Sequence, residues 1–391
     1  MDLYKQFYGV SGECFKEKTC EHTAYEIAHQ PIMWRRLGEY LKKMKPEIFG
    51  FMGKMGNLKN MRIILTGAGS SGFAGRAVAG YLAKAAGINC DAIHTTDIVS
   101  APDVYLFADT PTLLVSFGRS GNSPESVGAV EYARKIVKNL YELAIVCDGT
   151  SRLSAITRES ENGLLLVMPE GTNDKGFAMT SSVSTMIMAG FAALSGYDIQ
   201  KISGDMDLLA DQIETKGPDM VRAAKTCAEW GFDRAWYIGS GTHTALSQEG
   251  ALKIMELTNG AVVAGHNNSA EFRHGPKTVL SPKAVTIHFI SNNDFTARYD
   301  MDLLKELYSQ RDGNKVVAIH NEDAAVEADL AVPYKAFGHE AFADVVTDMQ
   351  GLVFMQLMAM YASLAIGVPT DNPSPSGLVN RVVQGVTVYQ I

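Results

Sequence analysis

Three charged residues recur at helical spacing in the segment Gln248–Glu256 and could carry acid–base chemistry. Glu249, Lys253 and Glu256 stand at positions i, i+4 and i+7, which places them on one face of a helix. A solvated, salt-bridged helix face has the same pattern, so the spacing alone leaves both interpretations open. The segment follows a Gly/Ser loop, Gly239–Gly241, which we expect at the ligand-binding edge of a parallel sheet. That position favours catalysis.

One histidine follows in a polar stretch, Ala270–Lys277, which reads Ala-Glu-Phe-Arg-His-Gly-Pro-Lys. A lone histidine is usually structural. His274 comes soon after a carboxylate–lysine stripe, however, and a histidine in such a setting is a candidate for proton transfer.

A phosphate-binding loop is predicted at Gly118–Ser123, between an apolar strand and a helix that starts with proline. Gly118 and Gly121 allow the backbone to turn, Ser120 and Ser123 supply hydroxyl donors, and Arg119 adds a positive charge. An ordinary Ser/Gly turn with Ser123 as the helix N-cap is the alternative.

A second Gly/Ser loop, Gly67–Gly72, follows the preceding strand and favours the phosphate interpretation, because both loops would lie at one sheet edge. Its Gly-x-Gly-x-x-Gly spacing is weak evidence for a dinucleotide, since no acidic residue ends a clear second strand about 20 residues later. Asp91 and Asp97 are the nearest candidates.

The elements that must position these residues are duplicated along the chain. Ile64 and Tyr237 lie in similar strand–loop sequences 173 residues apart, and two further apolar runs, Leu114–Ser116 and Leu143–Val146, match Ile287–Phe289 and Val316–Ile319 at the same offset. Apolar strands alternate with helix-length segments, which predicts an α/β fold with two doubly wound parallel sheets, each covered by helices on both faces. The loop of the second copy that matches Gly118–Ser123 is Ser291–Asp294, which lacks glycine and contains an acid that would repel phosphate.

Composition narrows the class of protein. The chain has 391 residues and a net charge of −8, and no run of basic residues suggests a nucleic-acid groove. No apolar run is long enough to span a bilayer and the start has no signal pattern, so we expect a cytoplasmic protein without a membrane partner. The five cysteines have neither zinc-site nor disulfide spacing, and Cys90 and Cys147 are expected to be buried and inert. No cofactor or metal is expected, because the histidines lack ligand spacing (His243, His266, His274 and His288).

Together these motifs resemble the sugar isomerase (SIS) domain superfamily, and their arrangement resembles the isomerase half of glucosamine-6-phosphate synthase. Gly176–Ser182 and Asn380–Val386 are similar to the AgaS family in particular, which comprises tagatose-6-phosphate ketose/aldose isomerases or galactosamine-6-phosphate deaminases. The resemblance runs from about Gln30 to the C-terminus. With the helical character of residues 1–60 and of the connector, we expect a helical N-terminal segment (1–60), a first SIS domain (61–200), a helical connector (201–229), a second SIS domain (230–370) and a C-terminal tail over the active site (371–391).

The resemblance also implies a role for each matching residue. Glu256 matches the carboxylate that moves a proton between C1 and C2 of the sugar, with Glu249 and Lys253 as companions. His274 matches the histidine that opens the sugar ring, which the neighbouring subunit supplies in the synthase, so a homodimer or larger homo-oligomer with a shared active site is expected. The expected phosphate contacts are Ser71, Arg119, Ser120, Asn122, Ser123 and Thr180, and the further substrate contacts are Gly69, Ser70 and Gln384.

Two departures from the synthase bear on the reaction. Only about 60 residues precede the first SIS unit and Cys14 is not terminal, so glutamine is not expected to be the nitrogen donor. Gln384 stands where the synthase has the lysine that forms an imine with the ketose, which excludes an enzyme imine there. We therefore expect deaminating isomerisation of an amino sugar phosphate, most simply galactosamine 6-phosphate to tagatose 6-phosphate and ammonia. Isomerisation of a hexose 6-phosphate without ammonia release, and a non-catalytic sugar-phosphate sensor, are the alternatives. No residue that distinguishes the hexosamines is identifiable.

Overall fold

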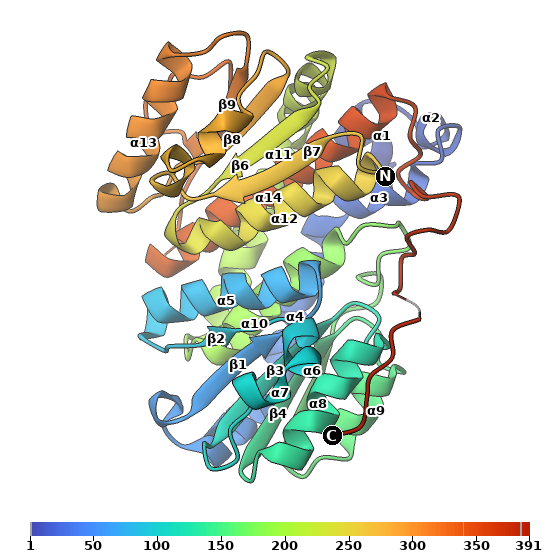
Figure 1. The fold of residues 1–391 in the computed structure, drawn as a ribbon, viewed down its shortest axis with the longest axis vertical. Helices are drawn as coiled ribbons and strands as arrows, with labels where there is room; N and C mark the ends of the chain where they lie inside the picture. The colour runs from blue at the N-terminus through green and yellow to red at the C-terminus, as the bar shows by residue number, and fades with distance from the viewer. Residues whose placement is uncertain (1, 339, 384) are drawn as a thin grey trace. The chain divides into compact units, whose positions relative to one another are not determined.

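The computed structural model of the chain describes residues 2–338, 340–383 and 385–391. These residues divide into two units. One comprises the chain up to Pro31 together with Lys175–Thr180 and Leu208–Ser376, and the other comprises Ile32–Asp174, Ser181–Asp207 and Gly377–Ile391. Each unit contains one parallel five-stranded sheet (Figure 1).

The unit that begins at Ile32 contains the first sheet, in the order β2-β1-β3-β4-β5. All seven residues of β3 are buried, as expected for a central parallel strand covered on both faces. The strands are β1 (Arg62–Thr66), β2 (Asp91–Ala92), β3 (Thr112–Gly118), β4 (Leu140–Val146) and β5 (Gly163–Val167).

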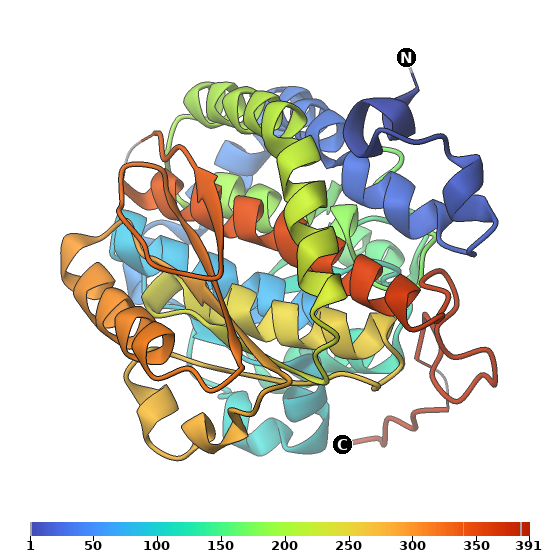
Figure 2. The ribbon, with the colours of Figure 1, turned by 90° about the horizontal axis from the view of Figure 1, so that it is seen from above.

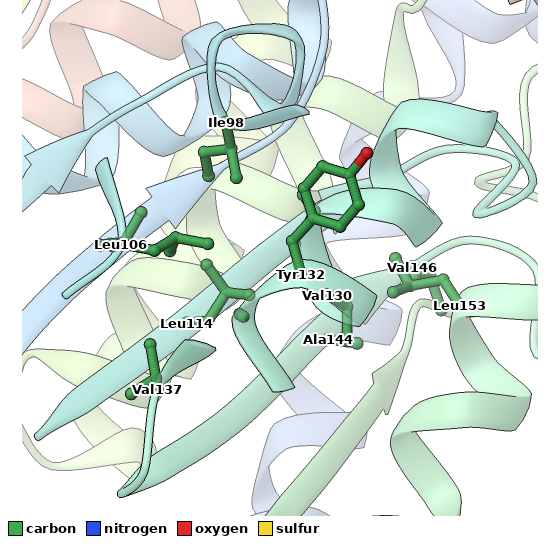
Figure 3. Close-up of a cluster of buried hydrophobic side chains, with 12 residues drawn as sticks. Ile98, Leu106, Leu114, Val130, Tyr132, Val137, Ala144, Val146 and Leu153 are labelled. Atoms are coloured by element: carbon green, nitrogen blue, oxygen red, sulfur yellow. The ribbon is translucent and has the colours of Figure 1, made fainter. Parts of the chain in front are cut away.

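Helices cover both faces of this sheet. On one face, Gly75 of α5 (Ser70–Ala86) packs against Leu65, and Gly190 of α10 (Ser181–Leu194) packs against Phe117. On the other face α8 (Pro124–Ile136) forms an apolar cluster with the alternate strand residues (Figure 3). The remaining helices of this part are α4 (Gln30–Met55), α6 (Thr95–Ser100), α7 (Pro102–Tyr105) and α9 (Arg152–Arg158).

The second sheet, in the other unit, has the order β10-β9-β8-β6-β7. Tyr237 and Phe289 face α12 (Thr244–Leu257) and α14 (Glu340–Ala365), whereas Ile238 and the alternate residues of β9 face α13 (Asp294–Ser309). The strands are β6 (Arg234–Ile238), β7 (Val263–Asn267), β8 (Ala284–Phe289), β9 (Lys315–Asn321) and β10 (Leu330–Tyr334).

Counted from β2 and from β7, the two sheets have the same strand order, and the predicted α/β fold with two doubly wound sheets is confirmed. Ile64 pairs with Leu114 and Tyr237 pairs with Ile287, in the register that the 173-residue offset predicts. The third match is displaced, because Val115 pairs with Leu143 whereas His288 pairs with Ala318 rather than Val316. The crossover between β8 and β9 is two residues longer, and a shift of two keeps each side chain on its face of the sheet.

The helical N-terminus divides between the two units. Residues up to Pro31 form α1 (Leu3–Tyr8), α2 (Glu13–Lys16) and α3 (Glu21–Ala28), which belong to the same unit as α14 (Figures 1 and 2). Of these helices, α3 contacts α14, and α1 and α2 contact α3. Gln30 donates to Gln356 of α14 at 2.8 Å. The long helix α11 (Ile199–Glu229) covers the predicted connector, and the unit boundary falls within it.

Two further expectations concern the cysteines and membranes. Cys90 and Cys147 lie just outside strands and are partly rather than fully buried, and burial raises the pKa of both thiols to about 12, which leaves them unreactive. No helix in the described part of the chain is long and apolar enough to cross a membrane.

Candidate functional site

The predicted phosphate loop joins the end of β3 to the start of α8. Gly121 adopts a φ of +60°, and a Cβ there would lie 2.3 Å from Ser151 Oγ, so the turn requires glycine. The carbonyl of Gly121 accepts a hydrogen bond from the Leu153 amide at 3.0 Å. The loop is therefore held against the start of α9.

The N-terminus of α8 has no side-chain cap. Ser123 occupies the N-cap position with extended backbone, but its Oγ donates to Ser126 Oγ at 2.6 Å instead of accepting from a first-turn amide. Ser123 is thus at the N-cap position, as the alternative interpretation expects, but its side chain does not form the capping hydrogen bond. Backbone amides at an uncapped helix start are suited to bind an anion.

The other loop side chains have different tasks. The side-chain Oδ1 of Asn122 accepts a hydrogen bond from the backbone amide of Arg152 at 2.9 Å, at the start of α9. The backbone N–H of Asn122 donates to Ser120 Oγ at 3.3 Å. Arg119 is 8% exposed, and its guanidinium donates to the carbonyl of Arg381 at 2.6 Å. The side chains of Asn122 and Arg119, two of the predicted phosphate contacts, therefore bind backbone groups of the protein in this structure.

The second loop lies at the same edge, because β1 and β3 are parallel neighbours. Gly69 has a φ of +55°, and Ser70 and Ser71, which open α5, are buried. A Cβ on Gly72 would lie 2.3 Å from the His94 ring, so close packing accounts for a glycine of the Gly-x-Gly-x-x-Gly pattern without a dinucleotide.

Two further predicted substrate contacts are Thr180 and Gln384. Thr180 belongs to the other unit, is fully buried, and accepts a hydrogen bond from Gln356 through its carbonyl at 3.3 Å. Gln384 lies outside the described residues.

The predicted stripe lies on α12, and it is not a solvated surface. Glu249 and Lys253 are 1% and 0% exposed, and Lys253 Nζ lies 3.5 Å from Glu249 Oε1. Lys253 also donates to Glu256, whose side chain is 26% exposed. Burying charges is costly unless they are paired. This arrangement therefore presents one accessible carboxylate supported by a buried lysine.

His274 lies between β7 and β8, directly after the short 3-10 turn Glu271–Arg273. Its backbone amide donates to the Glu271 carbonyl at 2.8 Å, and its imidazole is exposed. Within the described chain, no hydrogen bond or ion pair joins this imidazole to the α12 stripe. Arg273 and Lys277 bind Glu306, and these contacts, led by that of Lys277, lower the pKa of the Glu306 carboxyl.

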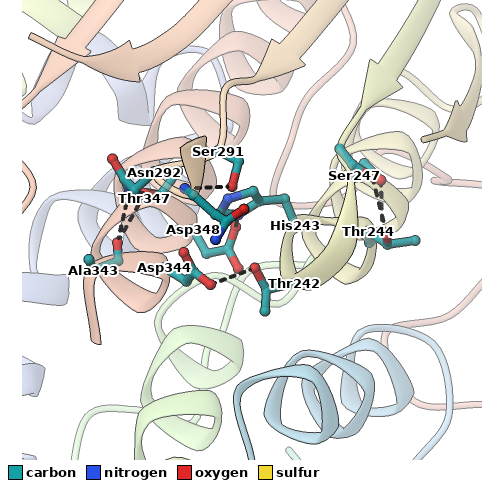
Figure 4. Close-up of polar contacts among 12 residues, drawn as sticks. Thr242, His243, Thr244, Ser247, Ser291, Asn292, Ala343, Asp344, Thr347 and Asp348 are labelled. Atoms are coloured by element: carbon teal, nitrogen blue, oxygen red, sulfur yellow. Dashed lines mark hydrogen bonds and ion pairs between the residues drawn. The ribbon is translucent and has the colours of Figure 1, made fainter. Parts of the chain in front are cut away.

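The matching edge of the second sheet is filled by a buried polar cluster that the sequence analysis missed (Figure 4). His243 Nδ1 lies 2.6 Å from Asp348 Oδ1, and both side chains are fully buried. Burial alone lowers the pKa of His243, but Asp348, with Asp344 and Asp300, outweighs it and raises that pKa to about 9. The signal available in the sequence was a pair of aspartates four residues apart in the largely apolar helix α14.

Asp300 of α13 binds the loop Ser291–Asp294, which corresponds to the predicted phosphate loop Gly118–Ser123. It accepts hydrogen bonds from Ser240 Oγ at 2.6 Å and from the Ser291 amide at 3.2 Å. Asn293 caps α13 by accepting from the amides of Phe295 and Thr296 at 3.2 and 3.1 Å. Asp294, the acid noted in the sequence of this loop, is exposed in the first turn of α13, and Asp300 adds a buried carboxylate.

Comparison with known proteins identifies the class. The family model described as the SIS domain matches the chain twice, over residues 58–195 and 231–359. The chain therefore belongs to the SIS domain family.

Proteins that match almost the whole chain identify a narrower family. The chain is 38% identical to "D-galactosamine-6-phosphate deaminase AgaS" of Escherichia coli, covering 94% of this chain and 95% of that protein. It is 36% identical to the protein of the same name from Shewanella sp. strain ANA-3, covering 94% and 91%. The crystal structure titled tagatose-6-phosphate ketose/aldose isomerase from Escherichia coli matches with a TM-score of 0.84 at 34% identity, covering 94% of this chain and 96% of that chain. Within the SIS proteins, the chain is a member of the AgaS family.

Proposed function

We propose that this protein is an enzyme that deaminates and isomerises an amino sugar phosphate, with D-galactosamine 6-phosphate as substrate and D-tagatose 6-phosphate and ammonia as products. The observation that carries the proposal is the α12 stripe, in which buried Lys253 supports the accessible carboxylate of Glu256. The names of the AgaS relatives support the choice of substrate.

The first SIS domain is proposed to bind the phosphate. The uncapped start of α8, together with the hydroxyls of Ser120 and Ser71, offers amide and hydroxyl donors to a dianion. The Ser123 hydroxyl joins them by turning away from Ser126, to which it donates in this structure. Thr180, Gly69, Ser70 and Gln384 remain proposed substrate contacts on the strength of the family resemblance. No metal or cofactor enters the proposed reaction.

The second domain is proposed to carry out the proton transfers. His274 assists ring opening to the aldehyde, and Glu256 removes the C2 proton to give an enolamine. The proton returns to C1, which leaves an imine at C2, and water hydrolyses this imine to the ketose and ammonia. The substrate's own nitrogen forms the imine, so the reaction needs no enzyme lysine at position 384. A proton-transfer group of this kind contributes roughly 10²–10⁴ in rate.

We further propose a cytoplasmic homo-oligomer in which His274 serves the neighbouring subunit's site. The exposed imidazole of His274 is compatible with that role. Mixing two inactive variants, Glu256→Gln and His274→Asn, tests it. Partial recovery of activity in mixed oligomers is expected, and recovery absent from verified mixed oligomers would assign His274 to its own subunit's site.

The second candidate reaction is aldose–ketose isomerisation without ammonia release, and the name of the E. coli structure favours it. An assay that measures ammonia and ketose together separates the two reactions. The 6-phosphates of galactosamine, glucosamine and their N-acetyl derivatives would be compared side by side. Equal amounts of ammonia and tagatose 6-phosphate from galactosamine 6-phosphate are expected. Turnover of a neutral hexose 6-phosphate, with no ammonia from any amine, would establish the second reaction instead.

A further inference from the structure

The described residues of the C-terminal tail, 377–383 and 385–391, belong to the same unit as the predicted phosphate loop, and the end of the tail lies along α8 (Figure 1). Tyr132 donates to the Tyr389 carbonyl, and Lys135 donates to Gln390 at 3.1 Å. A Cβ on Gly128 would lie 2.7 Å from Val388 Cγ1, so glycine allows the tail to lie close to the helix. The outer end of the tail is therefore anchored on α8, independently of the loop.

Two arginines make a separate contact where the tail meets the loop. Arg119 of the loop donates to the backbone carbonyl of Arg381 at 2.6 Å. The Arg381 guanidinium donates to Asn173 Oδ1 at 3.1 Å and to the carbonyl of Asp174. We name Arg119 and Arg381 the arginine clasp.

Arg381 binds the turn Asn173–Asp174, which is held in place by further hydrogen bonds. Both carboxylate oxygens of Asp174 accept hydrogen bonds from the start of α10, through the amides and hydroxyls of Ser181 and Ser182. Arg381 therefore binds the carbonyl of Asp174 rather than its carboxylate, and in the described chain it forms no ion pair. Arg381 Nε is buried without a hydrogen-bond partner. Arg381 is partly exposed and binds two neutral acceptors, the Asn173 amide oxygen and the Asp174 carbonyl, so this contact is weaker than an ion pair.

We propose that the arginine clasp couples phosphate binding in the loop to the position of the C-terminal tail, with Arg119 and Arg381 as positioning residues. Arg119 directly precedes Ser120, so a phosphate that orders Gly118–Ser123 also fixes the guanidinium that holds the tail. The tail then adopts its docked position fully only with a phosphorylated substrate. This inference rests on the proposed phosphate loop.

The coupling predicts a specific kinetic effect. Breaking the clasp with Arg119→Ala or Arg381→Ala should lower kcat/KM for the hexosamine phosphate by about 10²-fold, the cost of a mispositioned site. Affinity for inorganic phosphate should change much less in Arg381→Ala, because the loop amides remain in place.

Hydrogen–deuterium exchange of the full-length protein, with and without inorganic phosphate, tests the coupling. In the wild type, phosphate should slow amide exchange both in the loop (118–127) and in the tail (378–391). In Arg381→Ala, which leaves the loop residues unchanged, phosphate should still protect the loop but no longer the tail. Lys135→Ala is the matched control, since it removes a tail contact away from the loop. Its tail should exchange faster overall yet still respond to phosphate.

The contrary outcomes are distinct. A wild-type loop that is protected while the tail is unaffected would overturn the coupling and leave the phosphate site intact. A tail in Arg381→Ala that responds as in the wild type would overturn the clasp. A wild-type loop that phosphate does not protect would remove the proposed phosphate site, and the clasp with it.

Discussion

At the carboxyl edge of the first sheet α8 begins without a side-chain cap, whereas at the same edge of the second sheet Asn293 caps α13. Ser123 and Asn293 have similar extended backbone conformations, so their side chains and not the local chain path make the difference. In the second sheet, Asp300 and the His243–Asp348 pair occupy the polar space at this edge. In the first copy the amides at the start of α8 have no side-chain acceptor, whereas in the second copy Asn293 accepts the corresponding amides, and we propose that the first set binds an anion.

A duplicated unit can divide its tasks between its two copies. Once the second edge is filled by carboxylates, it is unfavourable for a phosphate. In this second copy, helix α12 holds a buried lysine paired with two glutamates. We propose that these residues carry the proton transfer. The proposed separation of binding from proton transfer follows from this difference.

The largest expected effect is at Glu256. Replacing it by glutamine keeps the shape and removes the base, so kcat should fall by about 10²–10⁴ with KM nearly unchanged. Steady-state ammonia release measures both constants. A variant with full turnover would remove Glu256 from the mechanism.

The next effect concerns stability, through the His243–Asp348 pair. Asp348→Asn leaves His243 buried without its charged partner and should cost roughly 3–5 kcal/mol in the free energy of unfolding. Chemical denaturation at neutral pH measures this cost. A change within the error of the wild-type value would show that the pair does not hold the second edge together.

The same pair predicts a pH dependence. The folded-state pKa of His243, about 9, lies above its ordinary value of 6.5. The stabilisation is therefore complete below pH 6.5 and is lost as the pH rises through 9. His243→Gln should flatten this part of the stability curve, as measured by thermal unfolding across that range. An unchanged slope in the variant would assign it to other groups.

A smaller effect is expected from copying the cap of the second sheet into the first. Ser123→Asn should let the side chain accept the first-turn amides of α8, as Asn293 does in α13. Competition for these amides should raise the Kd for inorganic phosphate about tenfold, the value of one charge-assisted hydrogen bond. Calorimetric titration measures it, and an unaltered Kd would place the anion elsewhere.

The smallest effect is that of the reverse control. Asn293→Ala removes the cap of α13 and should lower stability by about 1 kcal/mol. Phosphate affinity should stay at the wild-type value, because the second edge is not proposed to bind it. Weakened phosphate binding in this variant would contradict the division between the copies.

The sequence predicted the repeated strands because buried parallel strands are continuous apolar runs, and it predicted the α12 stripe because its spacing is local. It did not predict that the residues up to Pro31 pack beside α14, since chain order alone does not specify the packing partner. The buried Asp344 and Asp348 were also missed, because their burial depends on His243 and Thr242, about 100 residues away. The displaced register of β9 was not predicted, because it depends on the length of the crossover between β8 and β9. The pattern of apolar residues does not constrain that length.

Binding of galactosamine 6-phosphate by Glu256→Gln and by Ser123→Asn, measured in one calorimetric experiment, tests whether binding and proton transfer are divided between the two copies. Glu256→Gln should bind with wild-type affinity and release almost no ammonia, while Ser123→Asn should bind about tenfold more weakly. If Glu256→Gln lost affinity as much as Ser123→Asn did, binding and chemistry would not be divided between the two copies.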